Sequence, residues 1–137
     1  MGKMIRYIIA QIKPDVLKEI RINIGVIAQS DTEIQCRFVD NLSKRILGRF
    51  SPSIFDNLNE TYNEHISNEE GVRVYSEEDK EYIRIRPLQE EYLYFIKNIN
   101  KHQLRFGDIK VLKETDIDKA IFYIFQKEIP RELVKTT

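Results

Sequence analysis

The sequence predicts an α+β fold, in which an antiparallel sheet of about four or five strands carries three or four helices mainly on one face. Two observations lead to this prediction. The first of three successive N-terminal segments is apolar in both phases, and the next two alternate between apolar and polar residues; both patterns are typical of strands. From about residue 42 onward, apolar residues more often recur at three- and four-residue spacing, which is typical of amphipathic helices. We expect one globular domain over residues 1–130 and a frayed tail over 131–137.

Composition and charge limit the classes of function. The chain has 137 residues, of which 42% are hydrophobic and 32% charged, and this balance indicates a globular protein. Its 22 basic residues equal its 22 acidic ones, so there is no general attraction to nucleic acid or to an anionic membrane. The single Cys36 excludes an internal disulfide and points to a reducing compartment. No apolar run approaches the roughly 20 residues that span a bilayer, and no signal peptide is recognisable, so we expect a cytoplasmic protein.

Three N-terminal strands are expected over residues 4–13, 19–29 and 33–39. In the first strand both phases are apolar, which is typical of a strand in the middle of a sheet. The turn signals Pro14–Asp15 and Ser30–Asp31 make the two connections short. Short connections join antiparallel neighbours, so we predict a three-strand meander.

The segment over residues 19–29 alternates strictly, and its two phases differ in character. One phase is apolar throughout, and we expect it to face the core: Ile20, Ile22, Ile24, Val26 and Ala28. The opposite phase is expected on the open face of the sheet: Arg21, Asn23, Gly25, Ile27 and Gln29. Asparagine and glycine are both uncommon in strands, so their presence here needs a physical reason.

Two explanations are open for these polar and small residues. In the structural one, Gly25 marks a β-bulge or a close helix crossing, and Asn23 satisfies a neighbouring backbone group. In the functional one, Arg21, Asn23 and Gly25 bind a ligand or partner together with Arg37 from the neighbouring strand. These four residues are the candidate binding site.

The remainder of the chain predicts helices and a hairpin. Apolar residues at helical spacing indicate helices over residues 42–50, 51–66 and 87–102. Alternation over residues 72–75 and 80–86 predicts a β-hairpin. A short extended piece over residues 103–112 is broken at Gly107–Asp108, and Thr115 is expected to cap a last helix that ends before Pro130.

Residue types that carry catalysis or hold metals do not fall into a recognised pattern. The five glycines are too scattered for a phosphate-binding loop, and neither His65 nor His102 has a histidine at ligand spacing. Cys36 lies in the apolar phase of its strand, which is typical of a buried structural thiol. Acidic runs such as Glu69–Glu70 are typical of solvated loops. We therefore predict no catalytic residue, no metal site and no cofactor.

Two basic clusters favour nucleic-acid binding as an alternative function. The first lies along the helix expected over residues 42–50: Lys44, Arg45 and Arg49. The second combines Arg84 and Arg86 with Tyr82 on one strand, and arginines beside an aromatic ring can bind single strands by stacking. The structural interpretation is that both basic clusters are solvated charged surfaces, and the neutral net charge favours this interpretation.

The N-terminal segments carry a recognisable pattern. Its elements are Tyr7 in the first strand, the Pro14–Asp15 turn, and the run RINIGV over residues 21–26. On these residues the chain resembles a bacterial family of unknown function, the family numbered 3037. That family usually has a glutamate three residues before the asparagine, where this chain has Ile20, with Glu19 one place earlier. The family has no established activity, but its genes are often seen beside kinase-like proteins of the HipA type, so the resemblance implies a protein partner.

Three functional hypotheses follow, in order of preference. The first is a small cytoplasmic accessory module that acts through a protein partner, in a toxin–antitoxin or defence-type operon. The second is a nucleic-acid-binding protein that uses a basic set of residues: Arg21, Arg37, Lys44, Arg45 and Arg49. The third is an enzyme with a site around Asn23, which ranks last because no nucleophile, base or metal set is recognisable.

Overall fold

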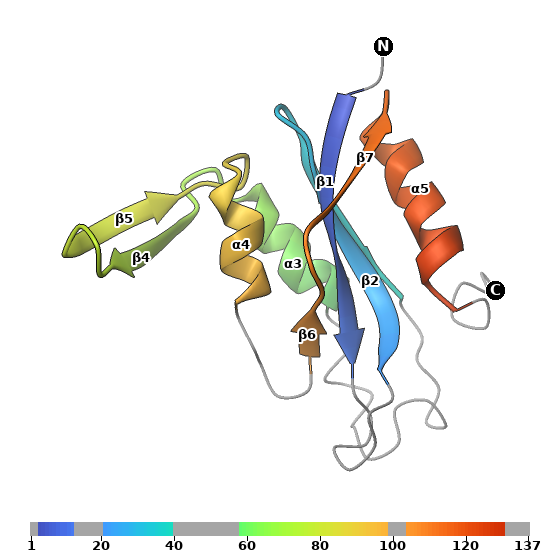
Figure 1. Ribbon diagram of the computed structural model, residues 1–137, viewed down its shortest axis with the longest axis horizontal. Helices are drawn as coiled ribbons and strands as arrows, with labels where there is room; N and C mark the ends of the chain where they lie inside the picture. The colour runs from blue at the N-terminus through green and yellow to red at the C-terminus, as the bar shows by residue number, and fades with distance from the viewer. Residues whose placement is uncertain (1–2, 13–20, 40–57, 99–103, 131–137) are drawn as a thin grey trace.

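The computed structural model describes residues 3–12, 21–39, 58–98 and 104–130 (Figure 1). The first three strands are β1 (Lys3–Ile12), β2 (Ile22–Gln29) and β3 (Ile34–Phe38). The middle of the chain forms α3 (Leu58–Ser67), β4 (Val72–Ser76), β5 (Glu81–Ile85) and α4 (Glu91–Lys97). The last elements are β6 (Leu104–Phe106), β7 (Lys110–Glu114) and α5 (Ile117–Glu128). None of the helices within these ranges is long and apolar enough to cross a membrane.

Within the described residues, the main sheet has five antiparallel strands, which confirms the α+β class with an N-terminal meander. β2 lies between β3 and β1, as the short turns predict. The other side of β1 is shared by two short strands, β7 along Lys3–Tyr7 and β6 along Ala10–Ile12. Between them the N–H of Gly107 donates to the carbonyl of Ile9 at 2.9 Å, so β6 and β7 form one interrupted edge.

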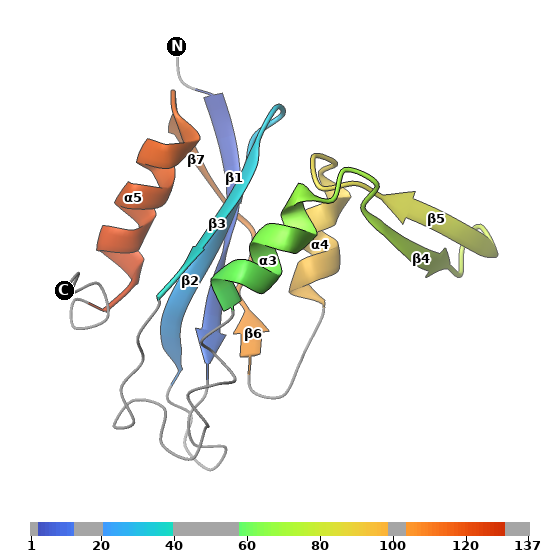
Figure 2. The same ribbon diagram turned by 180° about the vertical axis from the view of Figure 1, so that it is seen from behind.

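Helices cover both faces of this sheet: α3 and α4 lie on one face and α5 on the other (Figures 1 and 2). The assignment of β2 to a strand with one open face is therefore wrong. Ile27 and Gln29, expected in the solvent phase, are 0% exposed, because they lie on the side covered by α3 and α4. Val26 pairs with Arg37 and lies on the side of α5, and it is buried as expected.

Two helix boundaries differ from the expected ones. α4 begins at Glu91, because residues 87–90 form a turn in which the N–H of Gln89 donates to the carbonyl of Arg86 at 3.0 Å. The N-cap of α5 is Asp116, whose side chain accepts from the N–H of Asp118 at 2.9 Å, so the assignment of the cap to Thr115 is wrong. A carboxylate accepts this bond better than a hydroxyl. The helix expected over residues 42–50 lies outside the described residues.

The hairpin of β4 and β5 forms a second, two-stranded sheet, as predicted. It projects from the body of the molecule as an arm, on the side of α3 and α4 (Figure 1). Its exposed face pairs Arg73 with Arg84 and Tyr75 with Tyr82. A single hairpin of two strands is only marginally stable in water, so cross-strand side-chain contacts are important in this arm.

Candidate functional site

Asn23 occupies a structural position at the junction of the sheet with α5. Its side-chain oxygen accepts a hydrogen bond from Nε2 of Gln11 at 2.8 Å, and its Nδ2 donates to the carbonyl of Glu128 at 2.7 Å. Glu128 is the last residue of α5, and its carbonyl is one of the four that have no partner within a helix. Asn23 therefore satisfies a helix C-terminus from the neighbouring strand.

A β-bulge places the Asn23 side chain on the face of α5. Ala10 pairs with Gly25 while the next residue, Gln11, pairs with Asn23, so Ile24 is an extra residue in β2. Because of the extra residue, the side chains of β2 before Ile24 point to the opposite face from the one that regular alternation would give. This arrangement corresponds to the structural explanation considered for this segment.

Gly25 is required by close packing. A Cβ atom at this position would collide with the ring of Phe38 and would lie 2.9 Å from the carbonyl of Arg37. The Phe38 ring in turn stacks on Tyr62 of α3, with centroids 5.1 Å apart. Gly25 therefore allows an aromatic contact between the sheet and α3.

The four candidate residues do not converge on one site. Arg37 lies on the face of α5, with its guanidinium carbon 4.3 Å from the ring centroid of Phe125. Asn23 also contacts α5, whereas Gly25 packs beneath Phe38 on the opposite face. Arg21 is exposed immediately before β2. Residues of the basic alternative, Lys44, Arg45 and Arg49, lie outside the described residues.

Ionisable groups in the core are held in their neutral forms. Burial raises the pKa of the Cys36 thiol to about 12, so the thiolate needed for nucleophilic attack is absent near neutral pH. Burial also raises the pKa of Tyr62 to about 12. Within the described ranges, no three His, Cys, Asp or Glu side chains are grouped so that they could hold a metal ion.

A groove of about 790 Å³ lies where three distant segments meet: the turn into β3, the end of α3, and the turn before α4. We call it the α3–α4 groove. Its lining is apolar at four positions, Ile34, Ile66, Pro87 and Leu88. Three acidic residues, Glu33, Glu69 and Glu70, and one basic residue, Arg86, also line it. Apolar surface combined with a few charged groups is typical of a binding site.

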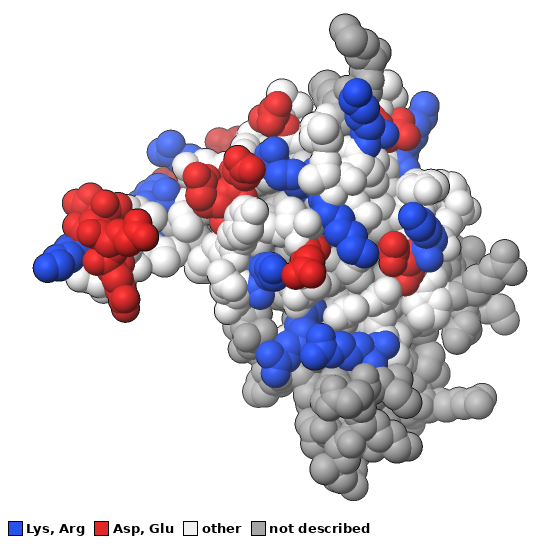
Figure 3. All heavy atoms as spheres, viewed as in Figure 1, with Lys and Arg blue, Asp and Glu red and all other residues white. Residues whose placement is uncertain are grey.

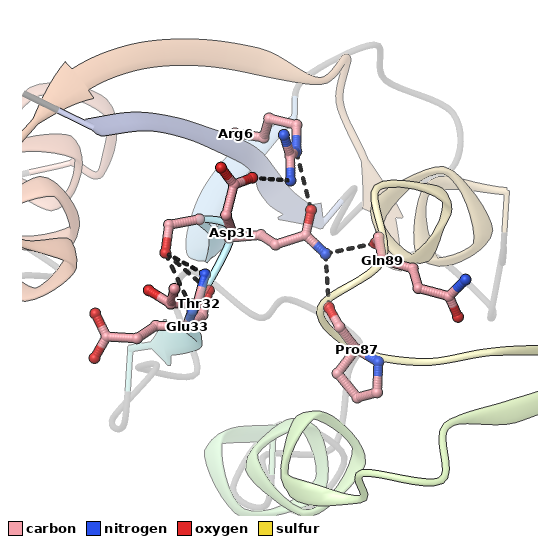
Figure 4. A network of polar contacts seen from close by, with 8 residues as sticks. Arg6, Asp31, Thr32, Glu33, Pro87 and Gln89 are labelled. Atoms are coloured by element: carbon pink, nitrogen blue, oxygen red, sulfur yellow. Dashed lines mark hydrogen bonds and ion pairs between the residues drawn. The ribbon is translucent and has the colours of Figure 1, made fainter.

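A buried glutamine at the end of β2 bonds to the turn before α4. Gln29 is fully buried, and its Nε2 donates to the carbonyls of Pro87 and Gln89 at 2.6 and 2.7 Å. Its Oε1 accepts from Nε of Arg6 at 3.0 Å, so all of its polar atoms have partners. Figure 4 shows how Arg6, Pro87 and Gln89 converge at this point. The turn before α4 is therefore anchored to the sheet.

A serine shapes the other wall of the groove. The hydroxyl of Ser30 accepts from the backbone N–H groups of Thr32 and Glu33 at 3.3 and 3.1 Å. These bonds fix the turn that presents Glu33 at the mouth of the groove, and Figure 4 shows Thr32 and Glu33 beside this network. Sequence reasoning missed the groove, because its walls come from three separate segments of the chain and no local pattern marks them.

The arm carries two exposed aromatic side chains. Tyr75 and Tyr82 are 50% and 63% exposed, with ring centroids 5.3 Å apart, and Arg73 lies over the Tyr82 ring at 5.1 Å. Arg84 is held at the base of the arm by the carbonyl of Glu70 at 3.1 Å and its carboxylate at 3.7 Å. The tip of the arm is a dense group of acidic side chains (Figure 3). It comprises Glu77, Glu78, Asp79 and Glu81.

Comparison with known proteins gives no match: no family model fits the chain, and no curated protein and no solved structure is significantly similar to it. The resemblance of the N-terminal strands to family 3037 therefore stays a prediction.

Proposed function

We propose that this protein is a binding module that acts through a partner protein. The observation that supports this proposal is the α3–α4 groove, where the apolar side chain of Leu88 is exposed and three carboxylates belong to the same lining. Leu88 is 45% exposed although it is large and apolar. Apolar surface framed by charge is typical of places where proteins bind other proteins.

The chemistry of the core also favours binding over catalysis. The thiol of Cys36 is protonated near neutral pH because burial raises its pKa to about 12. Asn23, around which an enzyme site was considered, uses its amide to join β2 to α5. Its polar atoms are therefore already engaged with the protein itself.

The partner class follows from the resemblance to family 3037, whose genes often lie beside kinase-like proteins of the HipA type. We extend the proposal to an accessory role beside such a protein in the cytoplasm. The free Cys36 thiol is compatible with a reducing compartment.

Capture of proteins from the native host tests this proposal. The tagged protein is compared with Leu88→Asp, which places a charge in the groove, and with Phe122→Asp, a matched control on α5. Phe122 is 56% exposed and Leu88 45%, so both substitutions act at similarly exposed apolar positions.

A protein retained in stoichiometric amount by the parent and by Phe122→Asp, but lost with Leu88→Asp, is the expected result. Failure to retain any stoichiometric protein, or equal retention by all three forms, would contradict a partner bound at the groove.

Nucleic-acid binding remains the second candidate because the arm stacks Arg73 on Tyr82, next to the exposed Tyr75. Aromatic rings beside arginine can bind successive bases of a single strand. The acidic tip opposes this function by repelling phosphate. If the arm binds nucleic acid, labelled single-stranded RNA should bind to the protein at low salt, and the double variant Tyr82→Ala with Arg73→Ala should bind the RNA more weakly. No binding at low ionic strength, where such association is strongest, would exclude this candidate.

A further inference from the structure

The two edges of the main sheet differ in how they are protected from further strand pairing. The edge formed by β6 and β7 is interrupted near Gly107, and its second half carries the exposed Lys110 and Lys113. Interruption and lysines are both devices that prevent edge strands from pairing with other chains. β3 forms the opposite edge, is continuous from Ile34 to Phe38, and contains no lysine.

The register shows which backbone groups β3 turns outward. The N–H of Val39 donates to the carbonyl of Ile24, and the N–H of Ser30 donates to the carbonyl of Glu33, both at 2.8 Å. In an antiparallel pair, such bonds flank residues whose own N–H and C=O groups point away from the partner strand. The outward-pointing residues of β3 are therefore Ile34, Cys36 and Phe38.

One of these three positions is closed by a side chain. The amide of Asn59 accepts from the N–H of Phe38 and donates to its carbonyl, each at 2.8 Å. Asn59 thus occupies the place that a residue of a further strand would take. At Ile34 and Cys36, among the described residues, no strand pairs with β3 on this outer side.

The open part of the edge leads into the α3–α4 groove, because Ile34, the first residue of β3, and Glu33 directly before it both line the groove. A strand paired there would direct alternate side chains toward the groove. Its apolar lining includes Ile66 and Leu88. Because the Glu70 carboxylate is paired with Arg84, the charge of the groove is set by Glu33 and Glu69 against Arg86. The net negative charge complements a basic ligand.

We propose that β3 binds an extended segment of a partner protein by strand addition, and that this segment alternates aliphatic residues with Lys or Arg. The aliphatic side chains enter the α3–α4 groove. The basic ones point to the opposite face of the added strand, where they pair with Glu33, which shares the phase of Gln35 and Arg37. Asn59 ends the pairing at Phe38, so the added strand bonds to Ile34 and Cys36. This inference rests on the proposed function and specifies the partner's chemistry.

A synthetic peptide tests the proposal directly. The probe is fluorescein-labelled acetyl-Lys-Ile-Lys-Val-Lys-Ile-Lys-amide, and its binding to the full chain is measured by fluorescence anisotropy. The controls are a peptide with every Lys replaced by Glu, and a peptide of the same composition with lysines and aliphatic residues in separate blocks. Only the alternating basic peptide should bind at moderate salt.

Two N-methylated peptides separate strand addition from simple charge attraction. One is methylated at the backbone nitrogens of its Ile and Val residues, the other at those of its central Lys residues. Because alternate N–H groups of an added strand face β3, one methylation pattern should weaken binding at least about tenfold and the other should change it little. Equal effects of the two patterns, or no effect, would overturn strand addition.

Variants of the protein locate the site. Glu33→Lys combined with Glu69→Lys should weaken peptide binding at least about tenfold. Glu77→Lys combined with Glu78→Lys changes the net charge equally at the tip of the arm and is the matched control. If both pairs weaken binding equally, the peptide is held by overall charge and the proposed site is wrong.

An edge variant tests the backbone of β3 itself. Ile34→Pro removes an outward N–H while leaving the bonds to β2, so the fold should persist in circular dichroism while peptide binding is lost. If this variant does not fold, the N-methylated peptides still decide the question. Sedimentation shows whether a second copy occupies the edge instead; self-association of the parent that is abolished by Ile34→Pro would overturn the proposal.

The outcomes also distinguish this inference from the proposed function. A host protein captured through the groove, together with a peptide indifferent to N-methylation, would overturn strand addition and leave the binding module standing. Loss of both the captured protein and the peptide signal would overturn both.

Discussion

Replacement of Asn23 tests whether this residue supports the structure or is free for recognition. Asn23→Ala removes a hydrogen bond from Gln11 and leaves the carbonyl of Glu128 without its donor, and both contacts are partly buried. Each such bond contributes about 0.5–1.5 kcal/mol, and an unsatisfied buried group adds to the cost. We therefore expect the free energy of unfolding to fall by about 1–3 kcal/mol.

The measurement is urea unfolding followed by circular dichroism, with Gln11→Ala and the double variant beside Asn23→Ala. Gln11→Ala removes the bond to Asn23 but leaves the bond from Asn23 to Glu128, so it should cost less. The double variant should cost less than the sum of the two single variants, because they share one bond.

Asn23→Asp adds a pH-dependent test at the same position. The introduced carboxylate cannot donate to the carbonyl of Glu128 and lies at the negative end of the α5 dipole, so the fold favours its protonated form. Its pKa is then higher in the folded protein than in the unfolded chain. The variant should approach the parent in stability below about pH 4 and lose stability as the pH rises above that value.

A change of less than about 0.5 kcal/mol for Asn23→Ala, with no difference between the variants, would refute this reasoning. The bond to Glu128 would then contribute nothing to folding, and Asn23 would again be a candidate for recognition.

Four further substitutions or measurements test other parts of the structure. Gly25→Ala should destabilise the fold by about 1–3 kcal/mol in urea, since its methyl group meets a buried aromatic ring. Gln29→Leu leaves two carbonyls before α4 without a donor and should cost about 2–5 kcal/mol, measured by thermal unfolding. Asp116→Ala should cost about 1 kcal/mol through the lost cap, whereas Thr115→Ala, the matched control, should stay within about 0.5 kcal/mol. Cys36 should react with iodoacetamide at pH 8 only after unfolding, and rapid labelling of the native protein would contradict this. Because folding raises the pKa of the thiol to about 12, the free energy of unfolding should fall as the pH rises above about 9.

Local patterns predicted most of the described elements of the fold. Alternation predicted β2 and β3, apolar residues in both phases predicted β1, and the signals at Ser30–Asp31 predicted the antiparallel pairing of β2 with β3. The hairpin of β4 and β5 and the break of the following extended piece near Gly107 were also expected, although the pairing of that piece with β1 was not. These features depend on residues close together in the chain, where period and turn chemistry determine the geometry.

The burial of β2 on both faces was decided by tertiary structure. The phase of Ile27 and Gln29 resembles that of a solvated face, yet α3 and α4 cover it. A glutamine in a strand does not reveal whether its amide meets water or the carbonyls of Pro87 and Gln89, 58 and 60 residues away. The partner of a polar group is a property of packing, which local propensity does not contain.

The two candidate sites, the Asn23–Gly25 segment and the α3–α4 groove, differ in how much of them a local pattern could reveal. The unusual strand residues Asn23 and Gly25 marked a real feature, but it is a bulge and a helix end joined across 105 residues. The α3–α4 groove had no sequence signal, since Glu33, Glu69 and Leu88 are each unremarkable in their own segments. The sequence by itself determined which segments form strands and helices and where the strands turn. Only the tertiary structure brings the three segments of the α3–α4 groove together, because contacts between residues far apart in the chain are not encoded in any local pattern.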